Sequence, residues 1–283
     1  MKISLVIPNY NGGKYLLDCL KSIYATPPTF SLETILIDNA STDNSPAVAK
    51  KKFPQIQLIR LSQNYGFSRA VNAGIKKAKG DYVLLLNNDI RLTPTAINAL
   101  VKTLESNPRA GIVGGKMVDS QGRFCSPGFN LNPYLGFTIY NQSGQNTERE
   151  VDWLSGAAMM IKKSVFSRVG LFDEKFFFYF EDTDFCLRVK KAGFKIIYQP
   201  RAKILHLGGL SSRQVDKNLL YTWWYRGKFR CLLKNGNCLQ IITSLLIQSL
   251  LFPYKAMILH DGTGTTQIKS IFWARENLNE NGS

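Results

Sequence analysis

YVLLLNND, residues 82–89, is a run of five apolar residues followed directly by two amides and a carboxylate. Its length and aliphatic content predict a buried strand over residues 81–86. Similar short runs at 3–7, 34–37, 57–61 and 111–118 alternate with helical patterns at 14–24, 45–53, 68–78 and 93–104. This alternation predicts right-handed βαβ units, and so an α/β fold with a mostly parallel, Rossmann-like sheet flanked by helices.

Polar residues follow the predicted strands, at the ends where sheets of this kind bind ligands. They are Asn9-Tyr10-Asn11, Asp38-Asn39, Asn64-Tyr65-Gly66 and Asn87-Asn88-Asp89. Asp38 could accept hydrogen bonds from a nucleotide base or ribose, or it could simply cap a turn. Asp89 could bind Mg²⁺ or Mn²⁺, which prefer oxygen ligands and bridge carboxylates to phosphates. An ordinary turn without a metal is the alternative for Asp89.

The second half of the chain is less regular. Residues 123–150 are rich in Gly, Pro, Asn and Gln, which predicts an irregular or edge-strand segment that could cover a site. A helix is expected over 181–192, with an acidic start and Gly193 as its stop. Two short strands are expected at 195–198 and 202–207, the first ended by Pro200.

An aromatic run, residues 176–180, precedes three acids, Glu181, Asp182 and Asp184. Burial against aromatic rings can raise the pKa of a carboxyl toward a value that suits a general base. Stabilisation of the helix dipole also explains the acids, although not the aromatic residues before them. His206, one of two histidines, is a candidate ligand or else a packed core residue.

The composition indicates an anionic partner and a reducing compartment. The net charge is +16, which favours contact with nucleotides, anionic lipid or nucleic acid. The five cysteines are odd in number and form no CxxC pair, so a disulfide framework or a zinc site is not expected. The first residues do not resemble a signal peptide, and we expect the bulk of the chain to lie in the cytoplasm.

The C-terminal part has a different character. Residues 235–254 contain no charged side chain, and basic and aromatic residues precede them. Three structures remain open for this segment: helices that lie in a membrane surface, a packed helix pair, or a membrane span interrupted by polar residues.

Taken in order, these motifs resemble glycosyltransferase family 2, in its rhamnosyltransferase-like and galactofuranosyltransferase-like bacterial branch. The resemblance covers residues 1–212. It rests on Pro8-Asn9-Tyr10-Asn11, residues 37–43, residues 64–74, Leu86-Asn87-Asn88-Asp89, residues 153–157, residues 170–174, residues 181–184, and His206 followed by Gly208-Gly209 and Ser211.

The resemblance implies a GT-A fold and a set of roles. The nucleotide would be held by Pro8, Asn9, Asn11, Asp38, Asn39, Asn72 and Asn88. The metal, Mg²⁺ or Mn²⁺, would bind Asp89, with His206 and Asn87 beside it. Asp182, paired with Glu181, would be the general base, and the acceptor would contact Trp153, Ser155 and Gly156. The family's DxD-type motif has more acidic residues than this sequence, which has asparagine at positions 87 and 88 and keeps only the carboxylate of Asp89.

The implied reaction is an inverting transfer of a sugar from a UDP- or dTDP-linked donor to a glycan or lipid-linked glycan. We expect a catalytic domain over 1–212, with a nucleotide-sugar half (1–118) and an acceptor half (119–212). A helical, membrane-associating extension over 213–283 would hold the protein on the cytoplasmic face of a membrane.

The alternative is a non-catalytic nucleotide-sugar-binding or membrane scaffold protein. The absence of GxGxxG and GxxxxGK[ST] disfavours a dehydrogenase or P-loop ATPase. Nucleic-acid binding would explain the net charge but not the acidic residues Asp89, Glu181 and Asp182.

Overall fold

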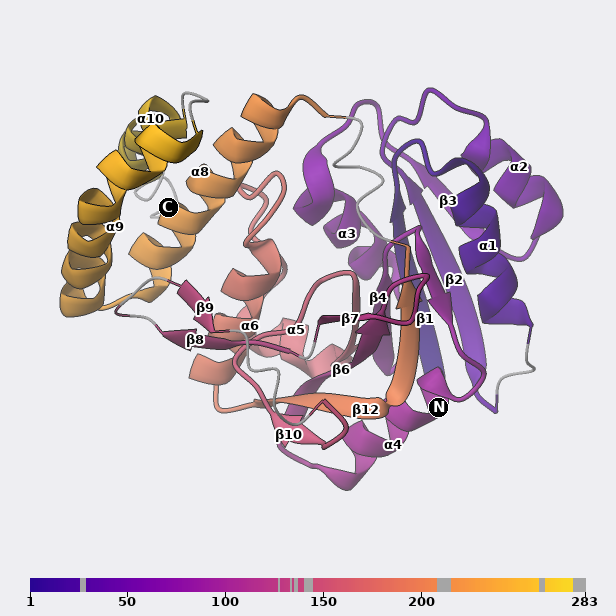
Figure 1. Ribbon diagram of the computed structural model, residues 1–283. Helices are drawn as coiled ribbons and strands as arrows, with labels where there is room; N and C mark the ends of the chain where they lie inside the picture. Colours follow the sequence, from indigo (N-terminus) through magenta and orange to yellow (C-terminus); the bar gives the residue numbers. More distant parts are fainter. Residues whose placement is uncertain are drawn as a thin grey trace.

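The computed structural model describes residues 1–25, 29–126, 128–132, 134, 137–139, 145–207, 215–259 and 263–276. Within these ranges a ten-stranded mixed sheet has the main strand order β10-β12-β6-β11-β4-β1-β2-β3, with β5 paired to β12 and β7 paired to β6. Helices flank this sheet, and the last three helices pack together beside it (Figure 1).

The N-terminal half is the predicted parallel α/β unit. Its strands are β1 (Lys2–Asn9), β2 (Ser31–Asp38), β3 (Gln57–Arg60) and β4 (Tyr82–Leu86), and its helices are α1 (Gly13–Tyr24), α2 (Ser45–Lys52) and α3 (Gly66–Lys77). Ile3, Leu5 and Ile7 pack in the cluster that includes α1, whereas Val6 packs in the cluster that includes α3. Helices thus cover both faces of β1, which explains its unbroken apolar pattern. Asn9 pairs with Asp38, so the polar strand ends meet at one edge.

The sheet is not parallel throughout. β11 (Ala158–Lys162) lies between β4 and β6 (Ala110–Val118) and is antiparallel to both. β5 (Ile90–Leu92), which precedes α4 (Ala96–Ser106), is antiparallel to the last strand, β12. Alternation of strands and helices up to residue 118 could not reveal this arrangement, because β11 enters the sheet only after the irregular segment.

The expectation of two separate strands at 195–198 and 202–207 was wrong. They form one strand, β12 (Lys195–His206), which pairs with β6 and shifts register between Gln199 and Lys203. Pro200 lies at this irregularity, where the lack of a backbone N–H is tolerated. The strand continues to His206, and Leu207 N donates to Asp89 O at 3.1 Å.

The irregular segment contains only short strands among its described residues, as expected. They are β7 (Phe124–Ser126), β8 (Asn130–Asn132), β9 (Phe137–Ile139) and β10 (Arg149–Glu150). After β11 come α5 (Lys163–Val169) and α6 (Glu181–Lys191), and α6 begins at the predicted residue.

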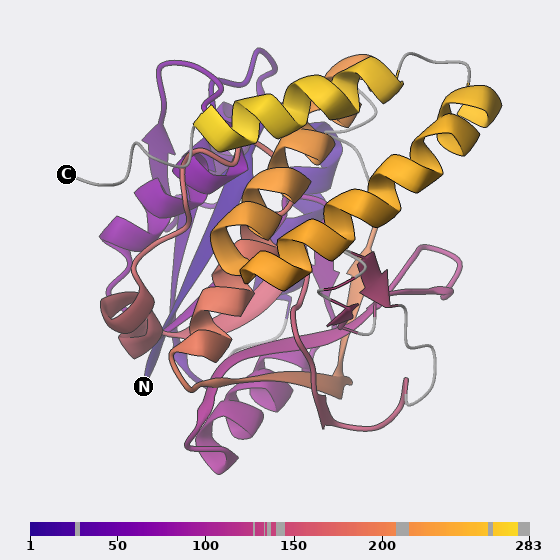
Figure 2. The same cartoon turned by 90° about the vertical axis from the view of Figure 1, so that its left-hand side faces the viewer.

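The C-terminal helices are α8 (Lys217–Asn235), α9 (Cys238–Leu259) and α10 (Thr263–Glu276). α8 packs against α6, and α9 and α10 lie on the outer side of α8 (Figure 2). Among the helices described, none combines the length and the apolar character that crossing a membrane requires.

The described part of α9 buries two polar side chains and exposes four aliphatic ones. Ser244 and Gln248 are buried, and Gln248 Nε2 donates to Ser244 Oγ at 2.9 Å. Four aliphatic side chains that recur at helical spacing are 55–79% exposed: Leu239, Ile242, Leu246 and Leu250. We call these four residues the α9 apolar row.

Candidate active site

A cavity of about 530 Å³ lies where the carboxyl ends of β1 and β4 meet the start of α6. Most of the predicted site residues line it, although they come from distant parts of the chain. The predicted residues on its wall are Pro8, Asn9, Asn39, Asn87, Asn88, Asp89, Trp153, Ser155, Gly156, Glu181, Asp182 and His206.

Amide side chains form one wall of the cavity. Asn88 Nδ2 donates to Asn9 Oδ1 at 2.8 Å, and Asn9 Nδ2 donates to Ser41 Oγ at 3.1 Å. Asn39 Nδ2 donates to Asn64 Oδ1 at 2.8 Å. These bonds fix the loops after β1, β2 and β4 relative to one another.

Three residues predicted to contact the nucleotide, Asn11, Asp38 and Asn72, are not among the residues that line the cavity. Asp38 Oδ1 accepts from Ser41 N at 2.8 Å, and Asn11 Oδ1 accepts from Thr42 N at 2.7 Å. Asn72, on α3, is buried and exchanges hydrogen bonds with the backbone of Phe172 at 2.8 and 3.0 Å. The side chain of Asn72 therefore holds residue 172 in place, and its contact with a nucleotide stays a prediction.

Asp89 and His206 lie together on the cavity wall. His206 Nε2 is 3.5 Å from Asp89 Oδ1, and this buried oxygen has no hydrogen-bond partner among the described residues. Asn87 also lines the cavity, and its N–H donates to Ala157 O at 2.8 Å. The Asp89–His206 pair fits a divalent cation, because a carboxylate oxygen and an imidazole nitrogen are suitable ligands.

The protein alone does not complete a metal site in the described parts of the chain. No group of three or more His, Cys, Asp or Glu side chains there is arranged to hold a metal ion. Proteins that bind Mg²⁺ or Mn²⁺ together with a phosphate-containing substrate commonly use one or two carboxylates, and the substrate phosphates supply further oxygen ligands. A cation at Asp89 and His206 would thus depend on a bound diphosphate.

Two carboxyl groups at the start of α6 face the same cavity. Asp182 Oδ2 accepts from Gly156 N at 2.9 Å, and Asp182 Oδ1 accepts from Thr183 N at 2.7 Å. Burial raises the pKa of Asp182 despite these bonds. Burial, followed by the charge of Asp182, raises the pKa of Glu181 well above its ordinary value. The hydrogen bonds to Asp182 favour its ionised form and so oppose the rise in its pKa, whereas the charge of Asp182 adds to the rise in the pKa of Glu181.

The aromatic run before α6 forms a second wall. Tyr179 and Phe180 have φ values of +73° and +68°, which are uncommon for residues with bulky side chains. Phe177 O accepts from Phe67 N at 2.7 Å, and a Cβ at Gly66, where φ is +81°, would overlap this carbonyl. The surrounding structure thus holds this turn in an unfavourable backbone conformation, a feature found at functional sites.

Trp153, Ser155 and Gly156 connect the two walls. Trp153 stacks on Phe129 with ring centroids 4.0 Å apart, and its buried Nε1 has no hydrogen-bond partner among the described residues. Ser155 Oγ accepts from Ala157 N at 3.3 Å, and Gly156 supplies the N–H that binds Asp182.

Several residues of the cavity wall were not predicted from the sequence, among them Trp223 and Trp224 on α8. Two adjacent tryptophans are a visible signal in the sequence, but they lie in the segment predicted to be a separate extension. Gly208, Gly209, Ser211 and the boundary after residue 212, which were also part of the prediction, lie outside the described residues.

This site and sheet define a glycosyltransferase of the GT-A kind, and comparison with known proteins agrees. Residues 4–170 match the family described as glycosyl transferase family 2, and the chain belongs to it. N-acetylglucosaminyl-diphospho-decaprenol L-rhamnosyltransferase of Mycobacterium tuberculosis is 32% identical over an alignment of 235 residues, which covers 72% of this chain and 75% of the relative. The chain is therefore a glycosyltransferase, an enzyme that transfers a sugar.

Solved structures share the fold. S. aureus TarS 1–349 in complex with UDP-GlcNAc has a TM-score of 0.65 at 17% identity, covering 97% of this chain and 80% of that one. The mannosyltransferase PcManGT from Pyrobaculum calidifontis, in complex with GDP-Man and Mn²⁺, has a TM-score of 0.59 at 16% identity, covering 99% and 88%. These likenesses confirm the GT-A fold.

Proposed function

We propose that the protein transfers a sugar, with inversion, from a nucleoside diphosphate to an acceptor hydroxyl, and that Asp182 is the general base. One observation carries this proposal: Asp182 and the Asp89–His206 pair face a single cavity large enough for a sugar and a diphosphate. A base and a cation-binding pair at separate surfaces could not act on one substrate.

In this mechanism Asp182 accepts the proton of the acceptor hydroxyl while that oxygen attacks the anomeric carbon. The nucleoside diphosphate leaves from the opposite face, so one displacement inverts the configuration. Gly156 N and Thr183 N hold the carboxylate of Asp182 in place. A cation at Asp89 and His206, Mg²⁺ or Mn²⁺, would neutralise the charge that develops on the diphosphate. Asn9, Asn39 and Asn88 would position the nucleotide.

For the substrates, we propose a UDP- or dTDP-linked sugar and a sugar linked to a lipid diphosphate. The relative from M. tuberculosis carries its rhamnose acceptor, N-acetylglucosaminyl-diphospho-decaprenol, in its name. Rhamnose and an N-acetylglucosaminyl lipid are therefore the first pair to test. Candidate donors can be ranked by thermal shift with Mn²⁺ or Mg²⁺, because a bound donor raises the unfolding midpoint.

The variant Asp182→Asn tests the base. We expect the rate of transfer to fall about 10²- to 10⁴-fold, because the amide cannot accept the proton. The nucleotide Kd should stay within about twofold, because Asp182 does not lie on the amide wall. Asp119→Asn, in an exposed turn, is the matched control. Near-normal turnover by Asp182→Asn would remove this residue from the mechanism.

The variant Asp89→Asn tests the cation site. Calorimetric titration of a nucleoside diphosphate with and without Mn²⁺ should show a metal-dependent gain in affinity for the wild type. We expect this gain to be lost in the variant, which keeps the size of the side chain but not its charge. An equal metal-dependent gain in affinity in both proteins would show that the cation binds at another site.

We also propose that the protein binds the cytoplasmic face of a membrane, where a lipid-linked acceptor resides, through the α9 apolar row. The net charge of +16 favours anionic lipid, and a helix with exposed aliphatic residues can lie in the headgroup region. Flotation with anionic vesicles should be lost in a Leu246→Glu, Leu250→Glu double variant. Tyr134→Glu, which changes an exposed aromatic side chain of the irregular segment, is the control. Equal flotation of the double variant and the wild type would argue against this surface.

A further inference from the structure

α8 reaches from the C-terminal helices into the wall of the cavity. Trp223 packs on Phe177 with ring centroids 4.4 Å apart, and Trp224 meets the edge of Phe180 at 5.4 Å. Both indole groups line the cavity and both are partly exposed. Phe180 directly precedes Glu181 and Asp182 along the chain, so the indole groups contact the turn that leads into the proposed base and line the same cavity as Asp182.

The position of α8 against this turn is fixed by close packing. A Cβ at Gly227 would lie 2.6 Å from Tyr179 O, so only a glycine allows this approach. One helical turn further, Arg230 donates to Asp173 Oδ2 at 2.7 Å, and Lys234 bonds to Asp173 and to the fully buried Asp184 at 2.9 and 3.1 Å.

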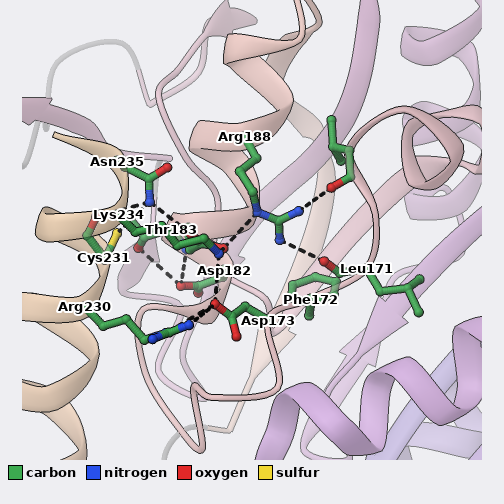
Figure 3. A network of polar contacts seen from close by, with 12 residues as sticks. Leu171, Phe172, Asp173, Asp182, Thr183, Arg188, Arg230, Cys231, Lys234 and Asn235 are labelled. Atoms are coloured by element: carbon green, nitrogen blue, oxygen red, sulfur yellow. Dashed lines mark hydrogen bonds and ion pairs between the residues drawn. The ribbon is translucent and has the colours of Figure 1, made fainter. Parts of the chain in front are cut away.

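Figure 3 shows these contacts, with Arg230, Lys234 and Asn235 of α8 directed toward Asp173 and the first turns of α6. Arg188 of α6 also bonds to Asp184, at 2.9 Å. The charged groups that join α8 to α6 are buried or partly buried, which makes α8 a fixed part of the site and not a separable appendage.

The groups around the aromatic rings indicate what this end of the cavity holds. Trp153, Ser155 and Glu181 line the cavity together with the two indole groups. A sugar ring offers C–H faces for aromatic rings and hydroxyl groups for polar side chains such as that of Ser155. The attacked hydroxyl must also lie next to Asp182, which places a sugar here and not the lipid.

We propose that Trp223 and Trp224 form the subsite for the acceptor's terminal sugar ring, which stacks on the indole groups beside Asp182. This inference rests on the proposed function and deepens it, because it assigns a part of the C-terminal helices to acceptor recognition. The lipid portion of the acceptor then lies outside this subsite.

The test compares two acceptors that carry the same sugar, N-acetylglucosamine linked to a long prenyl diphosphate and a water-soluble alkyl N-acetylglucosaminide. Trp223→Ala and Trp224→Ala should each raise the acceptor KM about tenfold for both acceptors, by loss of ring stacking. The donor KM should stay within about twofold. Trp223→Phe and Trp224→Phe should recover part of the affinity, because a smaller ring remains.

Trp273→Ala is the matched control, because Trp273 lies on α10 beneath Arg226 and does not line the cavity. A larger KM for the prenyl acceptor alone would assign the indole groups to the lipid and overturn the proposal. Unchanged acceptor KM values would also overturn it. A parallel rise in donor KM would show that the indole groups do not act on the acceptor alone, and it would overturn the proposal as well.

Acceptor binding measured by calorimetry, without turnover, separates this inference from the proposed reaction. If the wild type binds the alkyl N-acetylglucosaminide but transfers no sugar to it, the result contradicts the proposed reaction and supports the proposed subsite. If the wild type transfers sugar and the tryptophan variants bind and use acceptor normally, the subsite fails and the reaction stands. A wild type that neither binds nor uses an N-acetylglucosaminyl acceptor overturns both.

Discussion

Replacing Asp173 with asparagine tests how strongly α8 is joined to the site. Burial raises the pKa of Asp173, but the hydrogen bonds from Lys234 and Arg230 outweigh it and hold the pKa at about 2, against an ordinary value of 3.8. A difference of nearly two pKa units corresponds to about 2 kcal/mol of folding stability. The side chain of Asp173 is only 11% exposed, so solvent screens little of this interaction.

The sign of the pH dependence follows from the lowered pKa. A carboxyl group whose pKa is lower in the folded state stabilises the fold above about pH 4, and this contribution is lost as the pH falls toward 2. About 1 kcal/mol, roughly half of the contribution, should already be lost at pH 3. The gap in stability between the wild type and Asp173→Asn should therefore be widest at neutral pH and narrow in acid.

Thermal and urea unfolding at pH 7, 5, 4 and 3 would measure this gap. At pH 7 we expect the Tm of Asp173→Asn to be about 4–8 °C lower, as about 2 kcal/mol implies for a chain of this size. Glu150→Gln, which breaks an exposed pair with Lys195, should cost less than about 1 kcal/mol. An unchanged Tm at pH 7, or a gap that stays constant down to pH 3, would refute the reasoning.

Two further predictions concern the walls of the cavity. Gly66→Ala should lower the Tm more than Gly122→Ala does: both glycines have positive φ, but only at Gly66 would a Cβ overlap another residue, the carbonyl of Phe177. Equal shifts would contradict this. Transfer should decline in acid at a pH above the ordinary range of an aspartate, because Asp182 acts when deprotonated and burial raises its pKa. A profile of kcat/KM between pH 4 and 8 measures the decline, and a flat profile down to pH 4 would count against Asp182 as the base.

The N-terminal half of the fold and most of the cavity wall were predictable from the sequence. Parallel strands deliver their carboxyl ends to one edge, so Asn9, Asn39 and Asp89 had to lie near one another once the strands were recognised. The same argument did not apply to Asn72, because a position on a helix does not reveal which neighbour its side chain meets.

Other features depend on contacts that local patterns do not encode. The apolar run at 158–162 carries no sign that it enters the sheet antiparallel, between two strands that precede it in the chain. Trp223 reaches the cavity only because α8 packs on α6. The ion pairs that hold α8 in this position join residues 50 to 61 positions apart in the sequence. Pro200 predicted a strand end on local grounds, but pairing with β6 continues beyond it.

The place of β11 has a consequence for synthesis of the protein. β4 and β6 are both made before residue 158, yet they become neighbours only through β11. A nascent chain that has not yet left the ribosome beyond this point presents open edges on both β4 and β6, which can pair with other chains. Release of a chain truncated before residue 162 should therefore yield aggregates and not a smaller folded unit.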